Sequence, residues 1–290
     1  MLLHNPVARF VIPLVLLLGI VLLPARTALA ADAVAMVTDL QGPARLVDEG
    51  RQRPLALLEY LRPGHEVRLG KNARVTLIYF QSGTQYVAGG EGTVRIAVAK
   101  PEVAGGATLA GSETRQAALA ASARKDVVQG ALVMKTSPTP VALLSPAEGK
   151  LLDARLTFRW ESKRVKPPYR FTLLEEKGAR LVETQVSGTS YALPAEVKLR
   201  EGTRYVWRVE GQAGTASQGS DASFEIATAA ERDKLSQARP PAGAAFAERV
   251  LYATILDGMG FRDEARGQWR ALAAERPNDI RLRVRANKEH

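Results

Sequence analysis

The chain has 290 residues, of which 46% are hydrophobic and 24% charged, and its formal net charge is +10. It contains no cysteine, which excludes disulfides, thiolate zinc sites, iron–sulfur clusters and a cysteine nucleophile. The composition is that of a globular protein and excludes a collagen or a disordered acidic chain. At about 100–200 residues per domain, the length allows two or three domains.

Residues 1–30 predict a cleaved signal peptide. Arg9 supplies positive charge, Phe10 to Leu23 is an apolar run, and Ala28-Leu29-Ala30 forms a small-residue cleavage site. The run is shorter than the roughly 20 residues of a membrane-spanning helix. We therefore expect export to the periplasm with cleavage after Ala30, and an uncleaved inner-membrane anchor is the alternative.

Residues from Val34 to Lys100 predict short strands separated by glycine turns. Arg74 to Phe80 alternates polar and apolar residues at its start, but both faces of its end are apolar, so we expect that end to be covered on both sides. Strands this short, with turns between them, are typical of a rolled or solenoid-like β unit.

Three stretches of this region resemble the FecR-like periplasmic domain. They run from Val37 to Leu46, from Leu61 to Gly70 and from Ala73 to Leu77, and the turn Gln81-Ser82-Gly83-Thr84 stands where that family has Asp-Gly-Ser. The resemblance implies a β-rich envelope domain that makes protein contacts. The founding members carry a cytoplasmic anti-sigma helix bundle and a membrane span ahead of it. Since only nine residues precede the apolar run here, the resemblance does not imply sigma-factor control.

Residues from Pro101 to Pro140 are interpreted as a connector, because they are rich in small residues. Ala117 to Ala123 is Ala-rich and favours one or two helical turns. Val127-Val128 and Ala131 to Met134 predict strand material that returns to the first domain.

Residues 141–228 predict an immunoglobulin-like sandwich. Seven short alternating strands in this span are the expected pattern; we place them at 141–144, 156–160, 169–175, 181–185, 190–193, 205–211 and 223–226. Ser145-Pro146, the run Tyr205-Val206-Trp207-Arg208-Val209 and Phe224 resemble the fibronectin type III domain.

The residues after Ala229 change to a helical period. We expect a first helix over 229–238, then an apolar face through Phe246, Val250, Ala253 and Leu256, a break at Gly258-Met259-Gly260, and another face at Ala265, Trp269 and Leu272. The order Gly260, Ala265, Trp269, Leu272, Pro277 resembles one tetratricopeptide hairpin. A lone repeat cannot bury its own face. The hairpin must therefore pack on helix 229–238, on the tail, on the sandwich or on another protein.

The chain offers few groups for catalysis or metal binding. His65 follows a Pro-Gly turn, and we expect a turn-edge surface histidine rather than a base or ligand. Gly89 to Gly92 lacks the residues of a phosphate loop and predicts a turn. Glu175 and Glu176 are sequence neighbours on opposite strand faces, so they and Asp221 do not predict a glycosidase pair.

Two further sets of residues could serve either the structure or the binding of a ligand. Trp160, Tyr205 and Trp207 are expected in the sandwich core, and a sugar-stacking platform is the alternative. The tail residues Arg281, Arg283, Arg285 and Lys288 are expected to be a solvated end. The alternative is a clamp for an acidic partner, in which 281, 285 and 288 share a helix face.

The predicted protein is mainly β with a C-terminal α segment. Its parts are a signal peptide (1–30), a FecR-like β domain with connector (34–136), a fibronectin type III-like sandwich (140–228) and a helical tetratricopeptide-like hairpin with tail (229–290). We expect a non-enzymatic scaffold of the bacterial cell envelope with a protein partner, and no catalytic, metal or cofactor residue. A cell-wall or glycan-binding accessory role, with peptidoglycan or an anionic surface as ligand, is the alternative; nucleic acid is not an expected partner.

Overall fold

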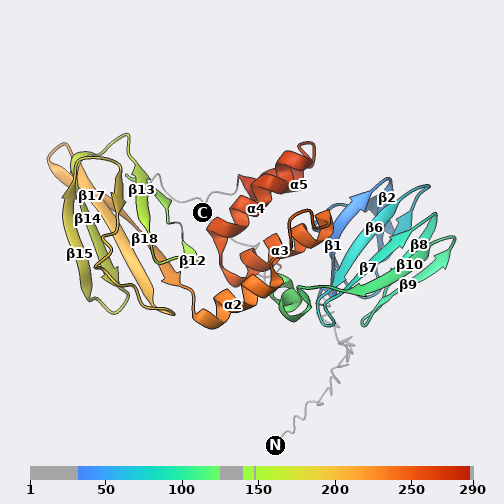
Figure 1. Cartoon of the computed structure of the whole chain (residues 1–290). Helices are drawn as coiled ribbons and strands as arrows, with labels where there is room; N and C mark the ends of the chain where they lie inside the picture. The colour runs from blue at the N-terminus through green and yellow to red at the C-terminus, as the bar shows by residue number, and fades with distance from the viewer. Residues whose placement is uncertain (1–31, 125–139, 147, 288–290) are drawn as a thin grey trace, which may run out of the picture. The chain divides into compact units, whose positions relative to one another are not determined.

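The computed structural model describes residues 32–124, 140–146 and 148–287 (Figure 1). This part of the chain is mainly β with a C-terminal helical segment, which confirms the predicted fold class. None of the helices within it has the length and apolarity that crossing a bilayer requires.

The first β unit consists of two five-stranded sheets, with the orders β10-β7-β6-β1-β4 and β3-β2-β5-β8-β9. Neighbouring strands in both sheets are antiparallel. The strands are β1 (Ala35–Gln41), β2 (Ala44–Asp48), β3 (Arg51–Pro54), β4 (Tyr60–Leu61), β5 (Glu66–Leu69), β6 (Arg74–Tyr79), β7 (Thr84–Gly89), β8 (Gly92–Ile96), β9 (Pro101–Gly105) and β10 (Thr108–Glu113).

Strand β6 is covered on both faces, as its sequence predicts. Val75, Leu77 and Tyr79 enter the core between the two sheets. Ile78 and Phe80 point the other way and belong to a second apolar core, which the helices complete. The loss of alternation at the end of the strand therefore marks the place where a second layer covers the sheet.

The interpretation of residues 101–140 as a connector is wrong for its first part. Strands β9 and β10 occupy 101–113, and the 3-10 helix η1 (Ala117–Arg124) follows. Small residues such as those of Gly105 to Ala107 suggested a linker, but strands pair through backbone groups and need no large side chains. The strand material predicted at 127–134 lies outside the described residues.

The sandwich pairs a three-stranded sheet, β11-β13-β16, with a five-stranded sheet, β12-β18-β17-β14-β15. The seven strands predicted from the sequence are present, and the structure adds the three-residue β12, which runs parallel to β18. The strands are β11 (Ala142–Ser145), β12 (Gly149–Leu151), β13 (Thr157–Glu161), β14 (Lys166–Glu175), β15 (Arg180–Val186), β16 (Ser190–Ala192), β17 (Arg204–Ala213) and β18 (Ala216–Ile226).

Four helices follow: α2 (Ala229–Ala238), α3 (Phe246–Met259), α4 (Arg262–Glu275) and α5 (Ile280–Ala286). Thr228 and Glu231 form a capping box at the start of α2. Gly260 ends α3 in the left-handed conformation, with φ of 90°, which confirms the predicted break.

The helices share an apolar core with the first β unit. This core joins Met36, Ile78 and Phe80 of the β unit to Val250 of α3 and Trp269 of α4. Leu235 and Ala238 of α2, three residues of η1, and Leu282 and Ala286 of α5 complete it. The expected contacts with helix 229–238 and with the tail are present, while the outer face of the first sheet is a contact that the sequence did not predict.

Candidate protein-interaction surface

The predicted aromatic cluster lies in the sandwich core. Trp160, Tyr205 and Trp207 are fully buried, and the Trp207 ring centroid is 5.1 Å from that of Phe158. In the described part of the chain every Trp, Tyr and Phe is buried or half-buried. A sugar-stacking platform needs an exposed aromatic face, so these residues supply core packing instead.

The carboxylates of the sandwich are bound to arginines of neighbouring strands and loops. Glu175 Oε2 accepts a hydrogen bond of 2.7 Å from Arg200, and Glu176 Oε1 accepts one of 3.4 Å from Arg204. Asp221 Oδ1 lies 3.8 Å from Arg208. Each carboxylate thus has its own cation at the surface, an arrangement of structural ion pairs.

The glycines at 89–92 form a turn, as predicted. Strand β7 ends at Gly89 and β8 begins at Gly92, so the turn carries the chain from one sheet to the other. Gly90 has a φ of 88°, and a Cβ at this position would lie 2.7 Å from the carbonyl oxygen of Gly106. The turn therefore requires glycine for conformation and close approach.

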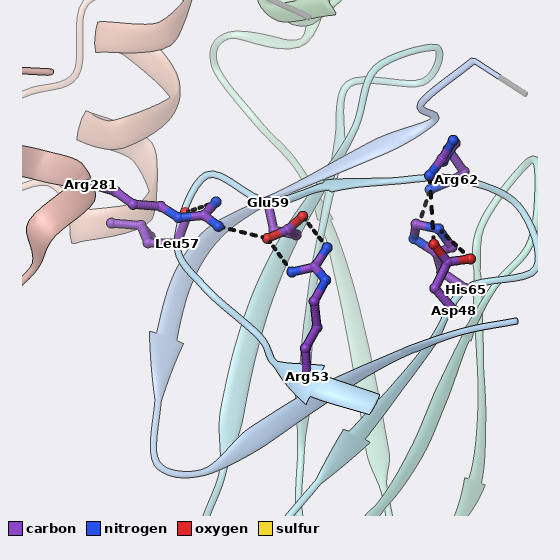
Figure 2. A network of polar contacts seen from close by, with 7 residues as sticks. All are labelled: Asp48, Arg53, Leu57, Glu59, Arg62, His65 and Arg281. Atoms are coloured by element: carbon purple, nitrogen blue, oxygen red, sulfur yellow. Dashed lines mark hydrogen bonds and ion pairs between the residues drawn. The ribbon is translucent and has the colours of Figure 1, made fainter. Parts of the chain in front are cut away.

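The expectation of a surface histidine at position 65 is wrong. His65 is only 5% exposed; its Nδ1 accepts a hydrogen bond from the backbone N–H of Arg62 and its Nε2 lies 3.4 Å from Asp48 Oδ1 (Figure 2). The Pro63-Gly64 turn folds the imidazole back under the chain, which a local motif does not reveal. Burial lowers the pKa of His65, although Asp48 acts in the opposite direction.

Glu59 stands between two arginines from distant parts of the chain (Figure 2). Its Oε1 accepts a hydrogen bond of 2.7 Å from Arg53, and its Oε2 accepts bonds from Arg53 at 3.0 Å and Arg281 at 2.9 Å. Burial acts to raise the pKa of Glu59, but the bonds from both arginines outweigh it and hold this pKa below its ordinary value. The ionised carboxylate thus joins α5 to the first β unit.

The basic tail is neither a solvated end nor, as a whole, a free clamp. Arg281 binds Glu59 and the carbonyl oxygen of Leu57, and Arg285 donates to Asp257 Oδ2 at 3.1 Å. Asp257 also accepts a bond of 2.7 Å from the Trp269 indole. These two arginines therefore fix α5 in place, while Lys288 lies outside the described residues. The side chain of Arg283 is exposed and makes no hydrogen bond or ion pair with any described residue.

Helix α5 is apolar on two opposite faces. Leu282 and Ala286 are buried against the helical core, whereas Ile280 and Val284 are 65% and 61% exposed. Positions two residues apart on a helix point to nearly opposite sides, so the exposed pair cannot share the buried face. Together with Arg283 and Asn287, the pair lines a shallow hollow. We call Ile280, Arg283 and Val284 the α5 surface.

The α5 surface was not predicted from the sequence, because the prediction for the tail considered only its basic residues. The signal was present in Ile280-Arg281-Leu282-Arg283-Val284, where apolar residues alternate. In a strand this spacing gives one apolar face, but in a helix it gives two. A helix with apolar residues on both sides is typical of a buried helix.

A second polar site lies where the sandwich meets α4. A cavity of about 300 Å³ is lined by residues of both, including Arg155, Arg159, Asp263 and Glu264. Glu264 Oε1 accepts a bond of 3.4 Å from the Leu152 N–H, and its buried Oε2 has no partner. Burial raises the pKa of Glu264, and Asp263 adds to this effect. Among the described acids that line the cavity, Glu264 alone has a buried carboxylate oxygen without a hydrogen-bond partner, and we interpret it as a structural carboxyl.

Within residues 32–124, 140–146 and 148–287, no group of three or more His, Cys, Asp or Glu side chains is placed to hold a metal ion. The search of protein-family models gives no match to this chain, and comparison with curated proteins gives none either.

Proposed function

We propose that this protein is a non-enzymatic scaffold of the bacterial cell envelope that binds another protein through the α5 surface. The observation that carries the proposal is the second apolar face of α5, which is exposed on a helix that two ion pairs anchor to its neighbours. An exposed aliphatic pair one turn apart on an anchored helix fits the mode in which a helix face contacts a partner helix or groove. The predicted signal peptide and the FecR-like and fibronectin-like resemblances support a place in the periplasm.

The chemistry of the α5 surface selects the partner. Ile280 and Val284 are one helical turn apart and offer an aliphatic contact. Arg283 is a cation without a described counter-ion, and α5 itself contains no acidic residue. The matching partner is an amphipathic helix with aliphatic residues on one face and an acidic residue beside them.

The burial of the aromatic residues supports this function over glycan binding. A cell-wall accessory protein of the kind considered above would present aromatic rings to sugars, and none of the described rings is exposed. Basic side chains remain available for an anionic surface, and the experiment below therefore includes purified peptidoglycan.

The test compares the wild-type protein with the variant Ile280→Asp/Val284→Asp. Proteins that cross-link to the wild type in envelope extracts should be lost from the double variant and retained by Val98→Asp, in which an equally exposed valine of the β8–β9 turn is changed. Arg283→Glu should lose the same proteins. Retention by peptidoglycan alone, with no protein that depends on α5, would contradict the proposal.

A further inference from the structure

Among the residues that the structure describes, strand β10 forms a sheet edge that no other strand or helix covers. It is the last strand of its sheet and pairs with β7 alone, from Thr108 opposite Gly89 to Glu113 opposite Thr84, with no bulge. Native sheets protect their edges with charges, proline, bulges or very short strands. An unprotected edge exposes a row of free backbone donors and acceptors.

The other edges of the first β unit carry these protections. Strand β4 has two residues, β3 contains Arg51, Arg53 and Pro54, and β9 begins with Pro101 and Glu102. Strand β10, in contrast, carries no charge before Glu113 at its end, and the uncharged stretch already begins at Val103. Five of its six residues are exposed. The protection of three edges and not of the fourth points to a use for β10.

The core of the first unit reaches this edge. Leu109 of β10 and Tyr86 of β7 are only partly buried and pack against the core between the sheets. Tyr86 lies opposite Gly111, and a Cβ at Gly111 would come within 2.9 Å of its ring. Leu109 and Gly111 therefore lie on the inner face of the sheet, and a further strand would cover the apolar groups that β10 leaves open.

We propose that two copies of this chain associate through β10, which pairs antiparallel with β10 of the second copy. A two-fold axis at Ala110 keeps both inner faces on the same side, because opposite residues of paired strands share a face. In this register Ala110 faces Ala110 of the second copy, Leu109 faces Gly111, and Thr108 faces Ser112. Each large residue meets a small one, and the two hydroxyl residues meet each other.

The charges permit this register. Glu113 is the single charged residue of β10. The two-fold axis places the two copies of Glu113 at opposite ends of the ladder, roughly 20 Å apart at the rise of an extended strand. That distance exceeds the screening length of about 8 Å at physiological salt. The positive net charge of the chain, which remains when residues 1–30 are removed, opposes association at longer range, so added salt should strengthen the dimer.

The decisive measurement is sedimentation velocity of the purified protein from about 1 to about 200 µM, the range in which a small interface associates. We expect a reversible monomer–dimer equilibrium. Ala110→Lys and Ala110→Asp should each sediment as monomers because like charges then meet across the axis. An equimolar mixture of the two variants should regain the dimer.

The matched control is Ala192→Lys, which places a lysine on the exposed edge strand β16 of the sandwich and should leave the equilibrium unchanged. At a protein concentration where the wild type is also monomeric, circular dichroism should give the same melting curve for all variants, since Ala110 is exposed. A wild-type monomer over the whole range overturns the proposal. The proposal is also overturned if either single variant dimerises with the same dissociation constant as the wild type, or if the mixture of the two variants stays monomeric. The β10 edge is separate from the α5 surface, so loss of partner binding would leave this result untouched.

Discussion

The guanidinium group of Arg281 donates a 2.9 Å hydrogen bond to Glu59, which lies 222 residues earlier in the chain. A second nitrogen of the same group donates to the Leu57 carbonyl oxygen at 3.0 Å. Arg276 adds a parallel contact, at 2.7 Å from Asp39 of β1, with its guanidinium 3.4 Å from the Phe246 ring centroid. These contacts tie the C-terminal helices to the first β unit.

Replacing Arg281 by methionine should destabilise the protein by about 1–2 kcal/mol, because Glu59 is largely buried and keeps one of its two cations. Urea unfolding followed by circular dichroism measures the loss. In the double variant with Glu59→Gln the two effects should not add, which identifies the pair as the cause. Arg283→Met changes an unpartnered arginine of the same helix and should cost less than about 0.5 kcal/mol; an equal loss there would contradict the pairing.

The sequence predicted the local elements better than their assembly. Periodicity located α2 to its residues and indicated that the end of β6 is covered twice, because both depend on short-range patterns. The helices that cover the outer face of β6, from Val250 to Trp269, come more than 150 residues later in the chain. No local sequence pattern connects these helices with the strand. The sequence of β10 predicted a linker, because its residues are mostly small or polar and show no alternation of apolar and polar side chains.

The candidate site shows the same limit. The basic tail is visible in the sequence, but its ion pairs are not. The acids that pair with its arginines, Glu59 and Asp257, come close to the tail only in the folded chain. Likewise, the burial of His65 and its contact with Asp48 are set by the fold and leave no signal in the residues beside it in sequence. Ile280 and Leu282 lie on opposite faces of α5, but this can be deduced only once the segment is known to be a helix.

His65 should make the folded protein sensitive to mild acid. Because burial holds its pKa below 6.5 in the folded state, the unfolded chain binds the proton first as the pH falls. Stability should therefore drop from about pH 6.5 down to the folded pKa, by at most about 1.4 kcal/mol per pH unit. Urea midpoints between pH 7 and pH 5 measure this slope. His65→Gln should remove it, and an unchanged slope in that variant would assign the effect to other groups.

Glu264 should act in the opposite sense. Its raised pKa means that the folded state prefers the protonated acid, so its contribution is present in acid and is lost as the pH rises through the folded pKa. Glu264→Gln mimics the neutral form and should raise the melting temperature at pH 7, with a smaller difference at pH 4. Glu196→Gln, at an exposed loop position, is the control and should change neither. A lower melting temperature for Glu264→Gln at pH 7 would show that the carboxylate is satisfied by partners.

Removal of residues 240–290 should affect the two β units differently: the first should lose part of its core, and the sandwich should stay folded. The truncated chain loses the helices that cover Met36, Ile78 and Phe80, so the first unit should expose apolar surface and bind the dye ANS. The sandwich has its own core and should stay folded. The three tryptophans make this measurable, because Trp269 is removed and only the buried Trp160 and Trp207 remain. Their emission should stay blue-shifted and should shift to the red only on urea unfolding. If the truncated chain binds no dye, the first unit is stable without its helical cover; if its emission is red-shifted in buffer, the sandwich depends on the helices too.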